Sequence, residues 1–213
     1  MIKAIIFDFD GVIADSLEVG FIATNKILEA FGMPVLNIEE FKEEFGADWR
    51  KFYRNRDVPE EMIDKEPELF KKEYEILKKE INIFDGINIV LDELVKKYKL
   101  GIVSNNHWES IVDFLQKFEI HGHFKSIVGY IPDAIKPDIK PLMICLNELS
   151  VKPEEAYLIG DTDDEILMGR RANVAKIIAV SYGYHPIHKL QGADAVVHNP
   201  MEILDAIRKF DGE

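Results

Sequence analysis

Short apolar runs rich in β-branched residues alternate along the chain with longer stretches in which apolar residues recur at helical spacing. The short runs predict β-strands, because a strand buried on both faces is apolar throughout. The longer stretches predict amphipathic helices that pack one face on a sheet. The predicted strands span residues 2–7, 99–103, 126–129, 156–159, 176–180 and 195–197. The predicted helices span residues 107–118, 138–149, 163–173 and 200–210.

This alternation is typical of an α/β protein with a doubly wound parallel sheet covered by helices on both faces. Parallel strands of one sheet end at the same edge, and ligands bind beyond those carboxyl ends. We therefore predict a Rossmann-like α/β core, with its functional side chains directly after strands.

One long interval interrupts the alternation. Between residues 16 and 83 no strand is predicted, while apolar positions such as Phe21, Ile27 and Leu28 recur at helical spacing. Charged runs in this interval fit solvated helix faces. We predict a core formed by residues 1–15 and 84–213, and a small α-helical cap formed by residues 16–83, inserted after the first strand.

The charge balance narrows the range of partners. Among 213 residues, 26 Lys and Arg residues stand against 39 Asp and Glu residues, a formal net charge of −13. A polyanion repels nucleic acids and anionic membranes, so neither a nucleic-acid polymer nor a membrane is predicted as a partner. An anionic substrate would need a local cation to receive it.

The number of cysteines and the length of the apolar runs indicate the cellular compartment of the protein. Cys145 is the only cysteine, which excludes an internal disulfide and a multi-thiolate metal site. No segment reaches about 18 consecutive apolar residues, the length a membrane-spanning helix needs. The apolar run before Asp8 is too short for a signal peptide. These features predict a cytoplasmic protein.

Two aspartates follow the first predicted strand. Asp8 and Asp10 emerge where the buried run at 2–7 ends. In extended backbone, residues two apart point to the same side, so both carboxylates face one spot. Gly11 then allows a tight turn. Two acids at one strand end predict a bound cation or a shared proton.

A second acidic cluster follows the predicted strand at 156–159. Asp161 comes directly after it, and three more acids occupy residues 163–165. Because parallel strands end at one edge, Asp161 is expected close to Asp8. Oxygen ligands without a Cys or His cluster favour a hard cation, best Mg²⁺. For the acids at 163 and 164, favourable charge at a helix N-terminus is the preferred interpretation.

Two further segments supply hydrogen-bond donors and positive charge. Ser104 and Asn105 follow the predicted strand at 99–103, and their hydroxyl and backbone amides suit a phosphoryl oxygen, although the same pattern also begins ordinary helices. Lys136 and Lys140 each precede a proline, and one of them can place a fixed charge near the acids.

Taken in order, these motifs resemble the haloacid dehalogenase superfamily of phosphotransferases. The shared features are an Asp-x-Asp-Gly motif ending the first strand, a Ser at a strand end, a Lys-Pro pair, and a late Gly-Asp with an acid four residues on. The resemblance covers the whole chain and extends to the phosphoglycolate-phosphatase-like branch with a C1-type helical cap. It implies Mg²⁺-dependent hydrolysis of small phosphate monoesters through an aspartyl phosphate.

The resemblance also implies catalytic roles. Asp8 matches the nucleophile, and Asp10 matches the general acid and base. Ser104 and Asn105 match positions that bind phosphoryl oxygens. Lys136 matches the lysine that holds the nucleophile and offsets negative charge, whereas Lys140 matches a variable position.

For the metal, the resemblance implies that Mg²⁺ binds Asp161, the carboxylate of Asp8 and the main-chain carbonyl of Asp10. Glu165 stands where many members carry Asp, so it is expected to support the site. Whether it contacts the metal directly or through water stays open.

The presence of Asp10 also distinguishes between the reactions that different branches of this superfamily catalyse. The dehalogenase and phosphonate-cleaving branches lack an acid there, which leaves phosphatases and sugar phosphomutases. The phosphomutases usually carry an acid where Gly160 stands, so hydrolysis is favoured. The other alternative is a non-catalytic member that binds phosphate or a protein, and the presence of Ser104, Lys136 and Asp161 argues against it.

Substrate choice is expected to come from the cap. Trp49 and Arg50 lie in the segment where related phosphatases have a specificity loop, so they are candidate contacts for the leaving group. A surface aromatic and a solvated cation are the alternative interpretation. Phosphoglycolate, sugar phosphates and nucleotide monophosphates all remain open as substrates, as does the oligomeric state. Residues 182–186 also border the predicted sheet edge, with no function assigned.

Overall fold

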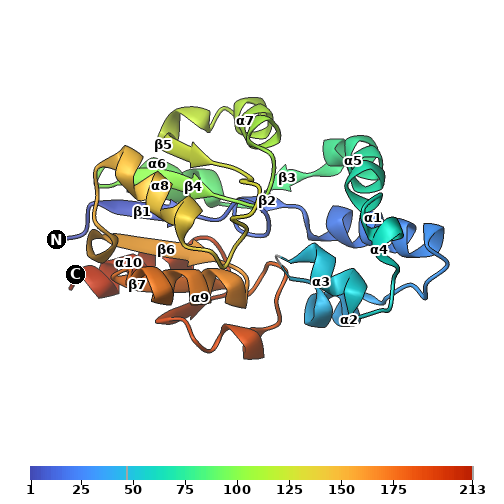
Figure 1. Ribbon diagram of the computed structural model, residues 1–213. Helices are drawn as coiled ribbons and strands as arrows, with labels where there is room; N and C mark the ends of the chain where they lie inside the picture. The colour runs from blue at the N-terminus through green and yellow to red at the C-terminus, as the bar shows by residue number, and fades with distance from the viewer. Residues whose placement is uncertain (47, 213) are drawn as a thin grey trace.

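A single parallel sheet with helices on both faces forms the core of the computed structural model, which describes residues 1–46 and 48–212 (Figure 1). The strand order is β5-β4-β1-β6-β7-β8, and every neighbouring pair is parallel. The predicted fold class, a doubly wound α/β sheet, is confirmed. The strands are β1 (Ala4–Phe7), β4 (Lys99–Val103), β5 (Phe124–Val128), β6 (Ala156–Gly160), β7 (Lys176–Val180) and β8 (Ala195–Val197).

The two faces of the sheet are buried in separate hydrophobic layers. On β1, Ile5 and Phe7 pack in one layer with α6, α7 and α10, while Ala4 and Ile6 pack in the other with α8 and α9. This alternation follows from the two-residue period of a strand. The core helices are α6 (Ile87–Leu94), α7 (Trp108–Lys117), α8 (Lys140–Leu149), α9 (Asp163–Ala172) and α10 (Glu202–Asp211). Short 3₁₀ helices are η1 (Lys78–Glu80), η2 (His121–His123), η3 (Pro153–Glu155) and η4 (Ile187–Leu190).

In the described residues of the interval assigned to the cap, five α-helices are grouped beyond one end of the sheet and away from both chain termini (Figure 1). They enclose an apolar cluster of their own that includes Phe52 and Tyr53. Its helices are α1 (Leu17–Ala30), α2 (Ile38–Glu44), α3 (Trp49–Arg54), α4 (Glu60–Ile63) and α5 (Glu66–Leu77).

A short ribbon joins this segment to the core. β2 (Ala14–Asp15) and β3 (Asn82–Ile83) pair in antiparallel fashion, with Ala14 opposite Ile83. The chain therefore enters and leaves the cap at one place, close to the carboxyl end of β1. Sequence patterning predicted neither strand, because two-residue strands carry no periodic signal.

None of the helices in the described residues combines the length and apolar character needed to cross a bilayer.

Candidate active site

β1 places Asp8 in the middle of the sheet edge. All four residues of β1 are buried, because helices cover both faces. β1 pairs with β4 on one side and β6 on the other, and the N–H of Asp8 donates to the carbonyl of Ile159 at 2.8 Å. Asp8 therefore lies where strand order reverses, which is the usual ligand site of open α/β sheets.

Lys136 lies between two buried carboxylates that come from different elements. Its Nζ is 2.7 Å from Asp8 Oδ1 and 2.7 Å from Glu165 Oε1. Burial disfavours a charged amine, but the two carboxylates raise the pKa of Lys136 above its ordinary value. Burial also opposes ionisation of Glu165, yet Lys136 holds the pKa of that carboxyl below its ordinary value. Lys136 thus stays positively charged, and its ammonium is held between Glu165 and Asp8.

Lys136 only partly compensates the negative charge of Asp8. Burial raises its pKa to about 7, although Lys136 acts in the opposite direction. Oδ1 accepts a hydrogen bond from the N–H of Phe9 at 2.7 Å in addition to its contact with Lys136. Because Lys136 is shared with Glu165, a further cation would stabilise the ionised form of Asp8.

Asp161 approaches Asp8 from the end of β6. Its Oδ2 accepts the N–H of Tyr184 at 2.7 Å, whereas Oδ1 is buried without a hydrogen-bond partner among the described residues. Burial, and then the charges of Glu165 and Asp8, raise the pKa of Asp161 well above its ordinary value. A Cβ added at Gly11 would lie 2.1 Å from Asp161 Oδ2, and Gly11 has φ +76°, so only glycine fits this turn.

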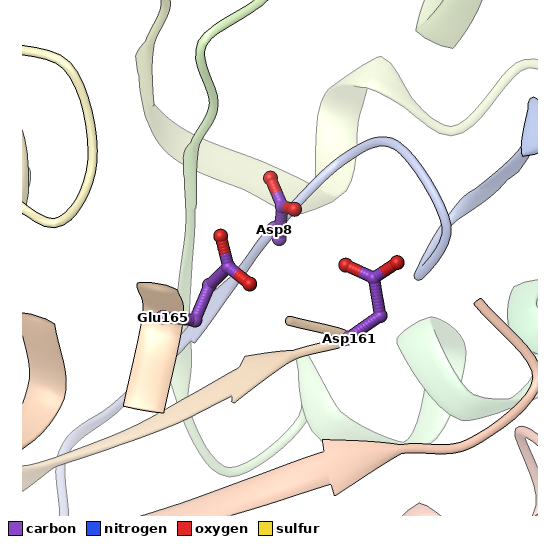
Figure 2. Close-up of side chains that lie close together, drawn as sticks. All are labelled: Asp8, Asp161 and Glu165. Atoms are coloured by element: carbon purple, nitrogen blue, oxygen red, sulfur yellow. The ribbon is translucent and has the colours of Figure 1, made fainter. Parts of the chain in front are cut away.

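The carboxylates of Asp8, Asp161 and Glu165 converge from the end of β1, the end of β6 and the first turn of α9 (Figure 2). One oxygen from each lies within 4.8 Å of the others. Glu165 Oε2 already accepts the N–H of Thr162 at 2.9 Å, and Oε1 contacts Lys136. Asp8 and Asp161, with its unpartnered Oδ1, therefore fit an oxygen-ligated hard cation such as Mg²⁺.

Asp10 occupies a separate polar environment beside this cluster. Its Oδ2 accepts a hydrogen bond from Asn106 Nδ2 at 3.1 Å. Burial raises the pKa of Asp10, and the side chains of Ser16 and Asn106 act against that shift. Asp8 is therefore paired with a cation, while Asp10 has neutral donors beside it and holds a proton more readily than a free aspartate.

Ser104 and Asn105 follow β4 at the same edge. Ser104 Oγ accepts the N–H of Asn106 at 3.0 Å, so its own proton is free to donate. Asn105 Oδ1 accepts the N–H of Lys136 at 3.1 Å, while its buried Nδ2 has no hydrogen-bond partner among the described residues. An unsatisfied donor and a free hydroxyl at one place suit an anionic oxygen.

Sequence patterning missed three polar residues that the fold brings to Asp10. Asn106 contacts it directly, and Ser16 lies beside it in the connection to α1. Tyr74 extends from α5 of the cap, close to both Asp10 and Asn106, and burial raises the pKa of its hydroxyl. Asn106 had a usable signal, its position directly after Ser104 and Asn105. Ser16 is six residues from Asp10, but no spacing rule marked it, and the Tyr74 contact joins distant segments.

Trp49 and Arg50 lie at the start of α3, within the cap. Trp49 packs against the cap's apolar cluster, and Arg50 stacks 4.7 Å from the centre of its ring. Arg50 also forms a 2.9 Å ion pair with Asp64. The contacts that the structure gives these two side chains are with cap residues, whereas those of Lys136 are with Asp8 and Glu165. Lys140, the second lysine of the Lys-Pro repeat, is exposed.

This chain is similar to known phosphatases over almost its whole length. The phosphoglycolate phosphatase of Chromobacterium violaceum is 28% identical over 218 residues, covering 97% of both chains. The N-acetylmuramic acid 6-phosphate phosphatase of Pseudomonas aeruginosa is 26% identical, covering 97% of this chain and 95% of its own. A haloacid dehalogenase-like hydrolase of Streptococcus pneumoniae superposes with a TM-score of 0.87 at 24% identity, over 97% of this chain and 98% of its own, which shows the shared fold.

A family model described as haloacid dehalogenase-like hydrolase matches residues 5–180. The match includes most of β1 and the Asp8 that follows it, the cap segment, and the strands followed by Ser104 and Asp161. The resemblance predicted from the order of the motifs is therefore confirmed: this chain belongs to the haloacid dehalogenase-like hydrolases.

Proposed function

We propose that this hydrolase is a Mg²⁺-dependent phosphatase that cleaves small phosphate monoesters through an aspartyl phosphate on Asp8. The observation that carries the proposal is the buried Asp8 carboxylate, 2.7 Å from Lys136 and beside Asp161 Oδ1, which has no hydrogen-bond partner in the described part of the chain. A nucleophile, a fixed cation and a carboxylate oxygen able to bind a metal are the groups that phosphoryl transfer to a carboxylate needs.

The relatives support the phosphatase assignment. The predicted enzyme class, a phosphoric monoester hydrolase, agrees with their names. Those names specify different phosphorylated compounds, phosphoglycolate in one and N-acetylmuramic acid 6-phosphate in another. We therefore assign the substrate to small phosphorylated metabolites as a class. A cytoplasmic location fits a protein with one buried, unpaired cysteine.

In the first half-reaction, the Asp8 carboxylate attacks phosphorus. Lys136 and the N–H of Phe9 both act on Oδ1, so we assign the attack to Oδ2. A bond forms between this oxygen and phosphorus while the bond from phosphorus to the leaving oxygen breaks. Asp10, whose pKa is raised by burial, gives its proton to the leaving oxygen, so the product departs as a neutral alcohol.

In the second half-reaction, Asp10 acts as a base. Its carboxylate takes a proton from water as the water oxygen attacks phosphorus, and the bond from phosphorus to Asp8 breaks. Phosphate leaves, and both aspartates return to their starting states. Asn106, 3.1 Å from Asp10, keeps the Asp10 carboxyl oriented through both steps.

The remaining residues hold the phosphoryl group. The Ser104 hydroxyl and the Asn105 amide donate to its oxygens, and Lys136 offsets its negative charge. Asp8, Asp161 and the main-chain carbonyl of Asp10 would hold Mg²⁺, with Glu165 orienting Lys136. Bound Mg²⁺ supplies the positive charge that reduces repulsion between a carboxylate and a phosphate dianion.

Hydrolysis of p-nitrophenyl phosphate, measured with and without Mg²⁺, tests the proposal. We expect turnover that requires Mg²⁺, and a loss of at least about 10⁴-fold in Asp8→Asn, the scale seen when a nucleophile is removed. Asp205→Asn is the matched control, because it makes the same change on an exposed side chain of α10. Full activity in Asp8→Asn, or turnover independent of Mg²⁺, would show that the mechanism is wrong.

A further inference from the structure

The segment between β7 and η4 touches the site through two consecutive residues. The N–H of Tyr184 donates to Asp161 Oδ2 at 2.7 Å, and the N–H of His185 donates to the main-chain carbonyl of Asp161 at 3.3 Å. Asp161 is thus held at its side chain and at its backbone. Because Oδ2 is occupied in this way, Oδ1 is the oxygen left for a ligand.

The same two residues also contact the cap. The ring of Tyr184 lies 6.1 Å from that of Phe41 and 6.2 Å from that of Phe45, and its hydroxyl donates to the carbonyl of Ser16 at 3.1 Å. His185 is buried, and its Nε2 lies 2.7 Å from the carbonyl oxygen of Phe45. A carbonyl only accepts, so Nε2 carries the proton in this hydrogen bond.

The other ring nitrogen of His185 faces the core. Nδ1 accepts the N–H of Asp163 at 3.2 Å, and the Asp163 carboxylate lies 3.3 Å away. One imidazole therefore joins the first residue of α9 to the end of α2. Asp163 is two residues after Asp161, so this contact acts on the same turn that carries the candidate metal ligand.

The core residues contact α2 at its C-terminal end, where main-chain carbonyls need hydrogen-bond donors. The last carbonyls of a helix have no partner within it. Here the carbonyl of Phe45 accepts from His185, and the carbonyl of Glu43 accepts from Lys189 of η4. His188 adds a 3.2 Å contact with the Glu43 carboxylate. Because His185 and Lys189 belong to the core, these carbonyls accept their hydrogen bonds only while the cap lies against the core.

We infer that Tyr184 and His185 form a latch that couples closure of the cap to the positioning of Asp161. The inference rests on the proposed function in that the ligand of Asp161 is taken to be Mg²⁺. Holding Asp161 favours a bound cation, and a bound cation in turn favours the closed cap, because coupling between two sites is reciprocal. His185 is a positioning residue in this scheme, since it touches no reacting atom.

The experiment measures cap position and Mg²⁺ binding separately. Paramagnetic labels on Glu39→Cys in α2 and Lys209→Cys in α10 report the distance between cap and core. Both positions are exposed, whereas the native Cys145 is buried and escapes labelling. Calorimetry with Mg²⁺ alone gives the affinity. Neither readout depends on turnover.

We expect Mg²⁺ to increase the closed population in the protein with native His185. In His185→Ala the Mg²⁺ dissociation constant should rise about fivefold, the scale of one lost hydrogen bond, and the closed population should fall correspondingly. His185→Gln, which keeps a donor and an acceptor, should recover part of both effects and guards against a folding defect. His121→Ala, the same change in η2, should alter neither.

The latch is overturned if folded His185→Ala keeps the native Mg²⁺ affinity, or if its Mg²⁺ affinity falls while the closed population stays native. The outcomes also separate the two proposals. Mg²⁺-dependent hydrolysis with no effect of His185→Ala on either readout removes the latch alone. A native protein that binds no Mg²⁺ removes both the metal of the proposed function and the coupling, whereas Mg²⁺ binding with the expected His185→Ala effects but no hydrolysis removes the proposed function alone.

Discussion

The ion pairs of Lys136 at the core site are buried, whereas the ion pair between Arg50 and Asp64 in the cap is exposed. In the core, the side chains of Lys136, Asp8 and Glu165 are 4%, 7% and 2% exposed. In the cap, those of Arg50 and Asp64 are 37% and 66% exposed. A buried ion interacts strongly with its partner and is costly to leave alone, whereas an exposed pair is screened by water. Charge therefore contributes to the geometry of the core site, whereas the Arg50–Asp64 pair adds little beside the apolar cluster of the cap.

The largest loss of stability should come from removing the buried charge of the core site. Lys136→Met removes the cation between two buried carboxylates, which should lower the free energy of unfolding by about 3–5 kcal/mol. Because Lys136 also lowers the pKa of Asp8, its loss should move the acid limb of the pH–rate profile to higher pH. Denaturant titration and the pH profile measure the two effects.

Lys140→Met provides the control, since this second lysine before a proline is exposed. It should change the free energy of unfolding by no more than about 0.5 kcal/mol. Equal losses in the two variants would contradict the difference between buried and exposed charge.

Glu66 tests whether a buried charge also affects stability in the cap, because this acid is only 5% exposed. Burial raises its pKa from 4.5 to about 7, although Arg50 acts against the shift. Folding thus favours the neutral form, so this contribution to stability is complete below pH 4.5 and is lost as the pH rises through about 7. The loss should reach about 3 kcal/mol.

Glu66→Gln should flatten this dependence, which urea unfolding between pH 4 and about 8 would reveal. Glu61→Gln, an exposed glutamate of α4, should keep it. If the stability of Glu66→Gln falls with pH as steeply as that of the native protein, a group other than Glu66 causes the pH dependence.

Tyr74 tests the boundary between the two regions, since it reaches from α5 toward Asp10 and Asn106. Tyr74→Phe should lower kcat/KM about fivefold, the effect of removing one hydrogen-bonding hydroxyl from a site. Tyr98→Phe removes a hydroxyl that bonds Asp211 instead, so it should leave kcat/KM unchanged. Equal kinetics in both variants would place the Tyr74 hydroxyl outside the reaction.

The smallest effect is expected for the exposed pair of the cap. Arg50→Ala should lower the free energy of unfolding by less than about 1 kcal/mol, because the ion pair with Asp64 is screened. The KM for p-nitrophenyl phosphate should stay unchanged, as for Lys51→Ala, an adjacent exposed cation. A several-fold rise in KM for Arg50→Ala alone would support the leaving-group contact predicted from the sequence.

Residues at strand ends could be predicted because their placement follows from local rules. Asp8 and Asp161 each follow a buried strand, and a parallel sheet brings such positions to one edge. The predicted strands at 99–103, 176–180 and 195–197 match β4, β7 and β8. One core helix, α6, was not predicted, since eight residues rich in Ile, Val and Leu do not distinguish a helix from a strand by periodicity.

Contacts between distant segments could not be predicted in this way. Tyr74 meets Asp10, and His185 meets the carbonyl of Phe45, across 64 and 140 positions of the chain. No spacing or period records such a pair, because it depends on how the cap is oriented on the core. The sequence alone placed residues 182–186 at the correct edge but gave no reason for them to contact α2.

The pairing of β2 with β3 gives the cap the form of a closed loop with adjacent ends. Paired strands lie about 4.8 Å apart, so the chain leaves and re-enters the core across one strand spacing. A segment with that property can be exchanged for another of different length or shape, provided its own ends are adjacent, without changing the register of the six-stranded sheet. Evolution or a protein engineer can therefore replace the insert as a unit while the six-stranded sheet that positions Asp8 keeps its register.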